Sequence, residues 1–310
     1  MSSAYGPPVA ALDCGTNSTR LLVTSHDGHT LLREMQITRL GQGVDATHRL
    51  KDEAVERTLA VLAGYRQAMD EFGVGRCRLV ATSAVRDAEN GGDFLSAATT
   101  AVGVTAELLS GEEEGRLSYT GATADIEMNE GDDLVIDIGG GSTEIVLRRD
   151  SSLETISLDI GCVRITERFL HSDPPTVNEL QEAEARIAHE LERAAKDIPS
   201  LTRLRDPRRL LGLAGTVSTL AALELGLVDY ERERIHHSVL TLSAVEHWAR
   251  VLAREPTSVR GRRAAISAGR EDVIVGGAMV LQMAMSRFGF DRCIVSESDI
   301  LDGIAASLLS

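Results

Sequence analysis

The chain of 310 residues carries a formal charge of −15, from 47 acidic and 32 basic side chains. Hydrophobic residues make up 43% of it and charged residues 25%, a composition typical of a folded globular protein and not of a disordered, collagenous or coiled-coil one. The length predicts roughly two domains of about 150 residues each. The excess of acid argues against a general nucleic-acid or anionic-membrane binder, because such proteins need a broad basic surface.

The cysteines and the N-terminus are typical of a cytoplasmic protein. Cys14, Cys77, Cys162 and Cys293 lie far apart and form no CxxC pair, so neither a zinc site nor a disulfide framework is predicted. The first residues lack the basic and apolar regions of a signal peptide. No apolar run approaches the ~18 residues that a membrane span requires. We therefore expect a cytoplasmic protein without membrane contact.

In chain order, the first half of the sequence predicts strands that alternate with helices. Residues 9–24 are typical of a strand, a tight turn and a second strand. Residues 52–72 have the apolar spacing of an amphipathic helix. A predicted strand over 78–82 leads into the start of a helix. Ser110 and Glu113 then form a predicted capping box ahead of another helix.

The second half repeats this alternation. Residues 134–141 form an apolar predicted strand that closes on glycines. Residues 176–196 predict an amphipathic helix whose outer face is rich in glutamate. Residues 210–219 are typical of a strand, a glycine turn and a row of hydroxyl side chains. Strands and helices that alternate throughout indicate an α/β protein.

One segment of the chain echoes another. Residues 13–23 align without gaps to residues 137–147, so that Asp13 matches Asp137 and the two turns share a glycine and a Ser-Thr pair. We interpret this as two lobes of similar topology, each opening with the same hairpin.

Each hairpin places a carboxylate at the end of a buried strand, before a turn rich in glycine and hydroxyl groups. Glycines allow backbone N–H groups to approach a ligand and surround an anion, and Ser and Thr hydroxyls add donors to phosphate oxygens. An aspartate beside a phosphate requires a cation between them, and Mg²⁺ is the expected one. The alternative is a pair of ordinary hairpins whose aspartates bond turn amides.

Six motifs, in their order along the chain, resemble those of the exopolyphosphatase and guanosine pentaphosphate phosphohydrolase family, within the actin-like ATPase superfamily. They lie at residues 13–20, 81–90, 110–116, 137–144, 161–167 and 212–216. The resemblance implies two ribonuclease-H-like lobes, 1–124 and 125–298, with the active site in a cleft between them. The last segment, about 299–310, is expected to pack back onto the first lobe.

The resemblance also implies how phosphates are held, through both turns and through residues near the start of the helix after the 78–82 strand. The implied phosphate-binding residues are Gly15, Thr16, Asn17, Ser18, Arg20, Ser83, Arg86, Gly139, Gly140, Gly141, Ser142 and Thr143. Arg86 can clamp a phosphate through two guanidinium nitrogens. Without the family pattern, the sequence favours a surface ion pair of Arg86 with Asp87 or a contact with Asn90.

Carboxylates are the candidates for activating water. The resemblance implies that the catalytic glutamate lies in the 110–116 motif. Glu114 is the first choice and Glu113 the reserve, because Glu113 occupies the third helical position of the capping box, where its side chain would bond the Ser110 amide.

Three carboxylates are candidate ligands for Mg²⁺, with Mn²⁺ as the alternative ion: Asp13, Asp137 and Glu144. Glu144 stands at the place of Arg20 in the repeat. Arg20 and Glu144 are expected either to form a salt bridge between the lobes or to lie in the outer shell of the metal.

Three further features lie outside these motifs. Arginine-rich runs at 203–209 and 260–263 either follow a polyanion or belong to solvated loops. His236 and His237 are expected to be structural and not to act as a base. Where the family commonly has Gly-Leu-Arg, this chain has Asp299-Ile-Leu, which removes an arginine that would contact phosphate.

We expect an exopolyphosphatase that releases orthophosphate from the end of polyphosphate. The alternatives are a pppGpp 5′-phosphohydrolase and, more remotely, a nucleotide-binding regulator that does not hydrolyse. A kinase of the same superfamily would need a larger acceptor domain. Longer family members append helical C-terminal domains, so ending at Ser310 predicts a preference for short chains. A homodimer is expected by analogy with the family.

Overall fold

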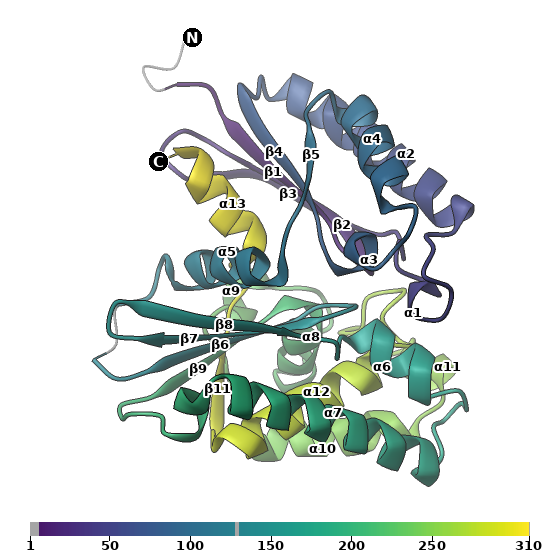
Figure 1. Cartoon of the computed structure of the whole chain (residues 1–310), viewed down its shortest axis with the longest axis vertical. Coiled ribbons are helices and arrows are strands. Elements are labelled where there is room, and N and C mark those ends of the chain that lie inside the picture. Colours follow the sequence, from purple (N-terminus) through teal and green to yellow (C-terminus); the bar gives the residue numbers. More distant parts are fainter. Residues whose placement is uncertain (1–5, 128–129, 310) are drawn as a thin grey trace. The chain divides into compact units, whose positions relative to one another are not determined.

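The structure, a computed structural model, describes residues 6–127 and 130–309. The chain divides into two compact units, one comprising Met1–Ala124 with Asp299–Ser310 and the other Asp125–Ser298 (Figure 1). We call them unit 1 and unit 2. Each is built of a sheet with helices, which confirms the predicted α/β class with two lobes. Within the described residues, no helix combines the length and the apolar character needed to cross a membrane.

Unit 1 contains a five-stranded sheet in the order β3-β2-β1-β4-β5. Its strands are β1 (Val9–Cys14), β2 (Ser18–Thr24), β3 (Thr30–Ile37), β4 (Arg76–Ala81) and β5 (Ala106–Leu108). Its helices are α1 (Val44–Thr47), α2 (Asp52–Glu71), α3 (Ser83–Arg86), α4 (Gly91–Val102), α5 (Gly111–Thr123) and α13 (Ile300–Leu309).

Both faces of the unit 1 sheet are covered by helices. On one face, Leu12 of β1 belongs to a buried cluster with side chains of α2 and with Phe94 of α4. On the other face, Ala11 lies in a second cluster with Ile304 of α13. Neighbouring residues of a strand point to opposite faces, so β1 contributes side chains to the apolar clusters on both faces of the sheet. For this reason it is apolar along most of its length. The final helix, α13, also packs along α5 (Figure 1).

Unit 2 contains a six-stranded sheet in the order β10-β11-β9-β6-β7-β8. Its strands are β6 (Asp133–Ile138), β7 (Thr143–Arg149), β8 (Ser152–Leu158), β9 (Arg209–Leu213), β10 (Val239–Thr241) and β11 (Arg292–Val295). Its helices are α6 (Cys162–Phe169), α7 (Val177–Asp197), the 3₁₀ turn Pro199–Thr202, α8 (Ala214–Glu224), α9 (Arg232–Ile235), α10 (Leu242–Arg254), α11 (Thr257–Arg260) and α12 (Ile274–Phe288).

The two sheets have the same core topology. In unit 1, β1 is antiparallel to β2 and parallel to β4. In unit 2, β6 is antiparallel to β7 and parallel to β9. The order β3-β2-β1-β4-β5 therefore recurs as β8-β7-β6-β9-β11, with β10 added at one edge. The repeated sequence motif occupies the β1–β2 hairpin of one unit and the β6–β7 hairpin of the other.

The predicted elements match the structure except at one turn. The helices expected over 52–72 and 176–196 are α2 and α7. The glycine turn predicted within 210–219 is wrong, because α8 begins at Ala214 directly after β9. Ala214 makes the corner itself, with a φ of 67° that is unusual for a residue with a side chain.

Candidate functional site

The β1–β2 turn is held from one side by the 38–41 segment. The carbonyl of Thr16 accepts from the N–H of Gly41 at 2.8 Å, and the carbonyl of Asn17 accepts from Thr38 and Arg39 at 3.1 and 2.9 Å. The N–H and C=O of a trans peptide point in opposite directions. The N–H groups of the next residues, Asn17 and Ser18, therefore point away from that segment, as an anion-binding turn requires.

The β6–β7 turn is held in the same way by α6. The carbonyl of Gly139 accepts from the N–H of Cys162 at 2.9 Å, and that of Gly140 accepts from Val163 at 2.8 Å. The carbonyl of Gly141 accepts from Gly161 at 3.3 Å. The same peptide geometry directs the N–H groups of residues 140–142 away from α6, in a row that can surround an anion.

A side chain on the first glycine of each turn would be in tight contact with the backbone. A Cβ on Gly15 would lie 3.1 Å from the carbonyl oxygen of Ser18, and a Cβ on Gly139 would lie 3.1 Å from that of Ser142. The repeat therefore extends from the sequence to the shape of the backbone. Both turns place the same close contact, with the same carbonyl, at their first glycine.

Two buried polar atoms beside the turn of the first hairpin have no hydrogen-bond partner among the described residues. They are Oδ1 of Asp13 and Nδ2 of Asn17. Oδ2 of Asp13, by contrast, accepts from Nε and Nη2 of Arg20 at 3.0 and 2.6 Å. Burial raises the pKa of Asp13 although Arg20 works to lower it. A cation at Oδ1 and a phosphate at Nδ2 would relieve this cost, so the residues fit the expected ligands.

The second hairpin sets two carboxylates against each other. Asp137 and Glu144 are directly opposite on β6 and β7, and both are buried. Glu144 accepts from the hydroxyl of Ser157 at 2.7 Å. In unit 1 the matching positions hold Asp13 and Arg20, which carry opposite charges. Like charges facing each other on one sheet are destabilising, and a divalent cation would offset that repulsion.

The 110–116 motif caps and begins α5. Ser110 accepts from the N–H of Glu113 at 3.1 Å, but the Glu113 carboxylate accepts from Arg78 at 2.8 Å, so the predicted reciprocal bond to the Ser110 amide is wrong. Glu113 is also largely exposed, with 47% of its side chain accessible. The Glu113 carboxylate is therefore engaged by Arg78, and not by the Ser110 amide as the sequence predicted.

Glu114 lies in a more enclosed position than Glu113. Only 12% of its side chain is exposed, and its Oε2 lies 3.3 Å from Nη1 of Arg86. The same Arg86 nitrogen donates to the carbonyl of Leu109 at 2.9 Å. The structure thus brings together the preferred base and a predicted phosphate ligand, with Ser83 buried at the start of the same short helix as Arg86.

Three predicted phosphate ligands have other contacts. The Thr143 hydroxyl donates to the carbonyl of Ile160 at 2.8 Å. The Thr16 side chain packs where a Cβ on Gly41 would lie. Arg20 forms ion pairs with Asp13 and with Asp299. Arg20 and Glu144 each have partners within their own unit.

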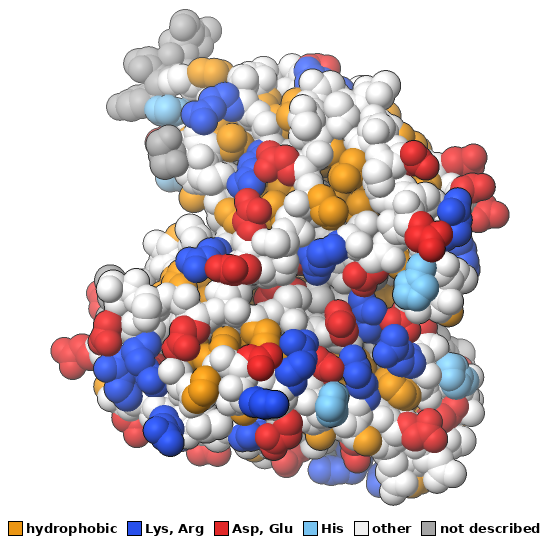
Figure 2. Space-filling model, in the orientation of Figure 1, with side chains coloured by type: hydrophobic (Ala, Val, Ile, Leu, Met, Phe, Trp, Pro, Cys, Tyr) orange, Lys and Arg blue, Asp and Glu red, His pale blue; other side chains and the backbone are white. Residues whose placement is uncertain are grey.

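The arginine run at 203–209 is neutralised locally. Arg205 pairs with Asp132 at 3.1 Å, and Arg209 pairs with Asp133 at 2.7 Å. Burial works to raise the pKa of Asp132, but hydrogen bonds from Arg149 and Arg205 lower it to about 2. Figure 2 shows basic and acidic side chains interspersed on the face in view. Through these ion pairs the run links the start of β9 to the start of β6.

The 260–263 run has local partners as well. Arg260 is buried and lies 3.4 Å from Asp173, and Arg263 pairs with Glu255. The arginines of the two runs that form these ion pairs are therefore neutralised by carboxylates of their own unit.

Arg270 is a cation that the sequence-based choice of site residues missed. A Cβ on Gly215, in the first turn of α8, would overlap the Arg270 guanidinium. Burial raises the pKa of the Cys162 thiol while the charge of Arg270 works to lower it. Arg270 therefore lies close to the start of α8 and to the first residue of α6, the helix that holds the β6–β7 turn. A signal for Arg270 lies in the sequence, because Arg270 opens a short run of charged residues.

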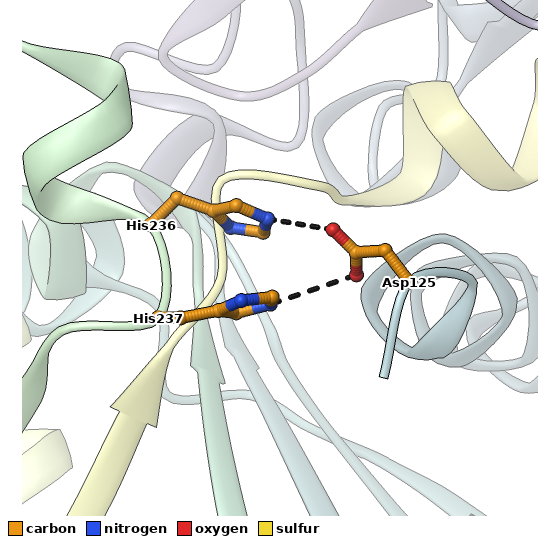
Figure 3. Close-up of side chains that lie close together, drawn as sticks. All are labelled: Asp125, His236 and His237. Atoms are coloured by element: carbon orange, nitrogen blue, oxygen red, sulfur yellow. Dashed lines mark hydrogen bonds and ion pairs between the residues drawn. The ribbon is translucent and has the colours of Figure 1, made fainter. Parts of the chain in front are cut away.

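Figure 3 shows a cluster of three side chains with metal-ligand chemistry: Asp125, His236 and His237. Nε2 of His236 lies 2.7 Å from Asp125 Oδ2, and Nε2 of His237 lies 3.6 Å from Oδ1. The two imidazole rings are stacked, with their centroids 3.8 Å apart.

The hydrogen bonds of His236 argue against metal ligation in this cluster. The N–H of Glu297 donates to Nδ1 of His236 at 3.1 Å, so a neutral His236 carries its proton on Nε2 and donates it to Asp125. A metal at Nε2 would need the lone pair of that nitrogen, and histidine ligands usually donate from their second nitrogen. His236 is therefore a structural link between Asp125 and Glu297, in agreement with the expectation from the sequence.

Comparison with known proteins identifies a matching family and similar proteins. Residues 21–310 match the model of the Ppx/GppA phosphatase family. The chain is 41% identical to "Exopolyphosphatase 2" of Mycobacterium tuberculosis, over 97% of this chain and 98% of that protein. It is 31% identical to the "Bifunctional 3-dehydroquinate synthase/phosphatase" of Fusobacterium nucleatum, over 95% of this chain and 45% of that protein.

Solved structures of similar proteins superimpose on nearly the whole of this chain. A Ppx/GppA protein of Aquifex aeolicus superimposes with a TM-score of 0.80 at 34% identity, covering 98% of both chains. An exopolyphosphatase from Cytophaga hutchinsonii superimposes with a TM-score of 0.89 at 25% identity, covering 97% of both. With the duplicated turns and their buried carboxylates, these matches establish that the chain belongs to the Ppx/GppA phosphatase family.

Proposed function

We propose that the protein is an exopolyphosphatase, which hydrolyses the terminal phosphoanhydride bond of inorganic polyphosphate and releases orthophosphate. The observation that carries the proposal is the duplicated turn, in which a row of outward N–H groups lies beside buried carboxylates. A chain of phosphates is a repeating anion, and each turn can hold one phosphate group. The relatives named exopolyphosphatase support this choice of substrate.

Phosphoanhydride hydrolysis needs held phosphates, neutralised charge and an oriented water. The N–H groups of residues 17–18 and 140–142 would hold phosphate oxygens. The Arg86 guanidinium would neutralise charge that builds up on the departing phosphate. The candidate Mg²⁺ ligands are Asp13 in unit 1 and Asp137 with Glu144 in unit 2. Mg²⁺ bound by these carboxylates would supply further charge neutralisation within each unit, and Mn²⁺ is the alternative ion.

Glu114 is the residue that would accept the proton of the attacking water. Its side chain is enclosed and ion-paired with Arg86, whereas Glu113 is exposed and paired with Arg78. An enclosed carboxylate is protected from bulk water and fixed in direction, as a general base must be. The Arg86 pairing also keeps the carboxylate beside a cation that can bind the substrate.

We expect Glu114→Gln to lower kcat for orthophosphate release by about 10²- to 10⁴-fold, the range for loss of a general base. Glu113→Gln is the matched control, since it removes the same charge one residue away. It should change kcat by less than about threefold, because an exposed ion pair contributes little. The measurement is orthophosphate release from polyphosphates of defined length, with Mg²⁺ and with EDTA. An unchanged Glu114→Gln rate, or an equal loss in both variants, would remove Glu114 from this role.

The same assay separates the proposed substrate from its alternative. pppGpp presents a terminal phosphoanhydride to the same turns, so it is the second substrate to offer. Rapid conversion of pppGpp to ppGpp with no release from any polyphosphate would replace the proposal by the pppGpp phosphohydrolase. No release from either substrate would favour a nucleotide-binding regulator.

Two further expectations accompany the proposal. A homodimer, expected from the family, is tested by light scattering during size-exclusion chromatography. A cytoplasmic location is in keeping with the four cysteines, all of which are free thiols in the structure. A fluorescent fusion in the source cell would test it.

A further inference from the structure

The β-strand register directs three charged side chains of unit 1 to the face that α13 covers. Asp13 is two residues from Ala11, which packs in the cluster formed with α13. Arg20 is directly opposite Asp13 on β2, and Arg33 is opposite Leu22, another member of that cluster. Because alternate residues share a face, Asp13, Arg20 and Arg33 all point to the α13 side of the sheet.

Asp299, immediately before α13, meets these side chains. Its Oδ1 accepts from the N–H of Leu301 at 3.0 Å, which caps the start of the helix. Its Oδ2 accepts from Nη1 of Arg20, and Oδ1 lies 3.7 Å from Nη1 of Arg33. The Arg20 guanidinium is thus shared, with Nε and Nη2 on Asp13 and Nη1 on Asp299.

The five charged groups alternate in sign along a continuous chain of contacts. Asp13 pairs with Arg20, Arg20 with Asp299, Asp299 with Arg33, and Arg33 with Asp302 at 2.5 Å. Three carboxylates and two guanidinium groups leave one negative charge in excess. The buried carboxylate oxygen without a hydrogen-bond partner in this chain of contacts is Oδ1 of Asp13. The excess charge can therefore attract a cation at that atom.

We propose that Asp299 is a positioning residue for the divalent cation at Asp13. It does so in two ways. By bonding Nη1, it fixes the guanidinium of Arg20 against Oδ2 of Asp13 and leaves Oδ1 to the cation. By balancing the charge of Arg20, it keeps Asp13 attractive to that cation. This inference rests on the metal requirement of the proposed function.

The test is Mn²⁺ binding to the full-length protein without substrate, followed by electron paramagnetic resonance. Asp299→Asn keeps the size of the side chain and its ability to cap α13, since asparagine is a good N-cap. It removes the charge that balances Arg20. We expect Mn²⁺ to bind roughly tenfold more weakly, which is equivalent to about 1.4 kcal/mol.

Asp302→Asn is the matched control. It removes the same charge from the same helix, but Asp302 contacts Arg33 and the Asp299 amide and lies one ion pair further from Arg20. We expect at most about a twofold loss of Mn²⁺ affinity. Equal losses in the two variants, or no loss in Asp299→Asn, would overturn the proposal. In an Asp13→Asn background, Asp299→Asn should have no further effect, and an undiminished effect would also overturn it.

Kinetics give a second readout that a purely structural role would not produce. Asp299→Asn should raise the Mg²⁺ concentration for half-maximal phosphate release, while saturating Mg²⁺ restores kcat to within about twofold. A kcat that stays low at saturating Mg²⁺ would overturn the positioning role. Because Mn²⁺ binding needs no substrate, the two proposals fail separately. Binding that depends on Asp299 in a protein that releases no phosphate refutes the proposed function alone.

Discussion

Asp13 and Asp137 occupy the same position in two hairpins, but the residue across the strand differs. Arg20 faces Asp13, whereas the acidic Glu144 faces Asp137. The first aspartate is therefore partly neutralised and keeps one buried oxygen without a partner among the described side chains. The second belongs to a pair of carboxylates. The two matching hairpins therefore differ in charge at one position of the repeat, where unit 1 has Arg20 and unit 2 has Glu144.

His236 is the residue whose titration is expected to affect stability. Burial lowers its pKa, the charges of His237 and Arg232 act in the same direction, and Asp125 opposes them. A folded pKa below the unfolded value of about 6.5 means that the unfolded chain binds more protons in this range. The stability contributed by neutral His236 is present above about pH 7. It is lost as the pH falls through 6.5 towards the lowered folded value.

We therefore expect His236→Gln to flatten the pH dependence of unfolding between pH 7.5 and 5.5. Glutamine can still accept from the Glu297 amide and donate to Asp125, but it does not titrate. The measurement is the urea midpoint at both pH values. His189→Gln, on the exposed side of α7, is the control. An equal decrease of the midpoint on acidification in wild type and His236→Gln would show that another group is responsible.

At the scale of elements, the geometry of each glycine-containing hairpin turn depends on the segment behind it. The β6–β7 turn lies against the first residues of α6, and a Cβ on Gly161 would lie 2.2 Å from the carbonyl oxygen of Gly140. Such a contact is far too short, so the turn or α6 would have to move. The N–H groups that we propose bind phosphate would move with the turn.

Gly161→Ala should therefore lower the free energy of unfolding by roughly 1–3 kcal/mol, as overpacking does, and reduce phosphate release more than tenfold. Gly64→Ala is the control. Gly64 lies inside α2, and its added Cβ would meet nothing within 4 Å. It should stabilise the protein by roughly 0.5–1 kcal/mol, because alanine favours a helix over glycine. Denaturant unfolding and the phosphate assay measure both effects, and normal activity in Gly161→Ala would contradict the role of α6.

At the scale of the whole molecule, unit 1 is built from both ends of the chain. The 299–309 segment returns to cover one face of its sheet, where Ile304 is fully buried against Ala11, Leu22 and Val80. Most of unit 1 precedes unit 2 in the sequence, and its last layer follows it. The core of unit 1 is therefore complete only when the C-terminal helix is in place.

Ile304→Ala should lower the free energy of unfolding by about 2–5 kcal/mol, through lost burial and a cavity under α13. Leu308→Ala, one turn further along and only half-buried, should cost clearly less. The check is urea unfolding followed by circular dichroism. Equal losses at the two positions would mean that α13 does not close this core as described.

Much of the fold could be predicted from local pattern. The α/β alternation, the helices α2 and α7 and the repeated hairpin depend on residue spacing within one segment, and all are present. The corner at Ala214 could not be predicted, because a positive φ in a residue with a side chain is imposed by the surrounding structure.

For the site, the sequence by itself determined which residue types lie in each turn. The backbone freedom of glycine, the charge of aspartate and the hydrogen-bonding groups of serine and threonine are properties of the single residue. Only the tertiary structure decided which of them have other partners. In the structure the Thr143 hydroxyl donates to the Ile160 carbonyl, and Glu113 pairs with Arg78. Arg20 pairs with both Asp13 and Asp299. Asp299 is far from Asp13 in the chain and meets it through Arg20 because α13 packs on that face of the sheet. Contacts between distant segments depend on packing, and no local pattern contains that information.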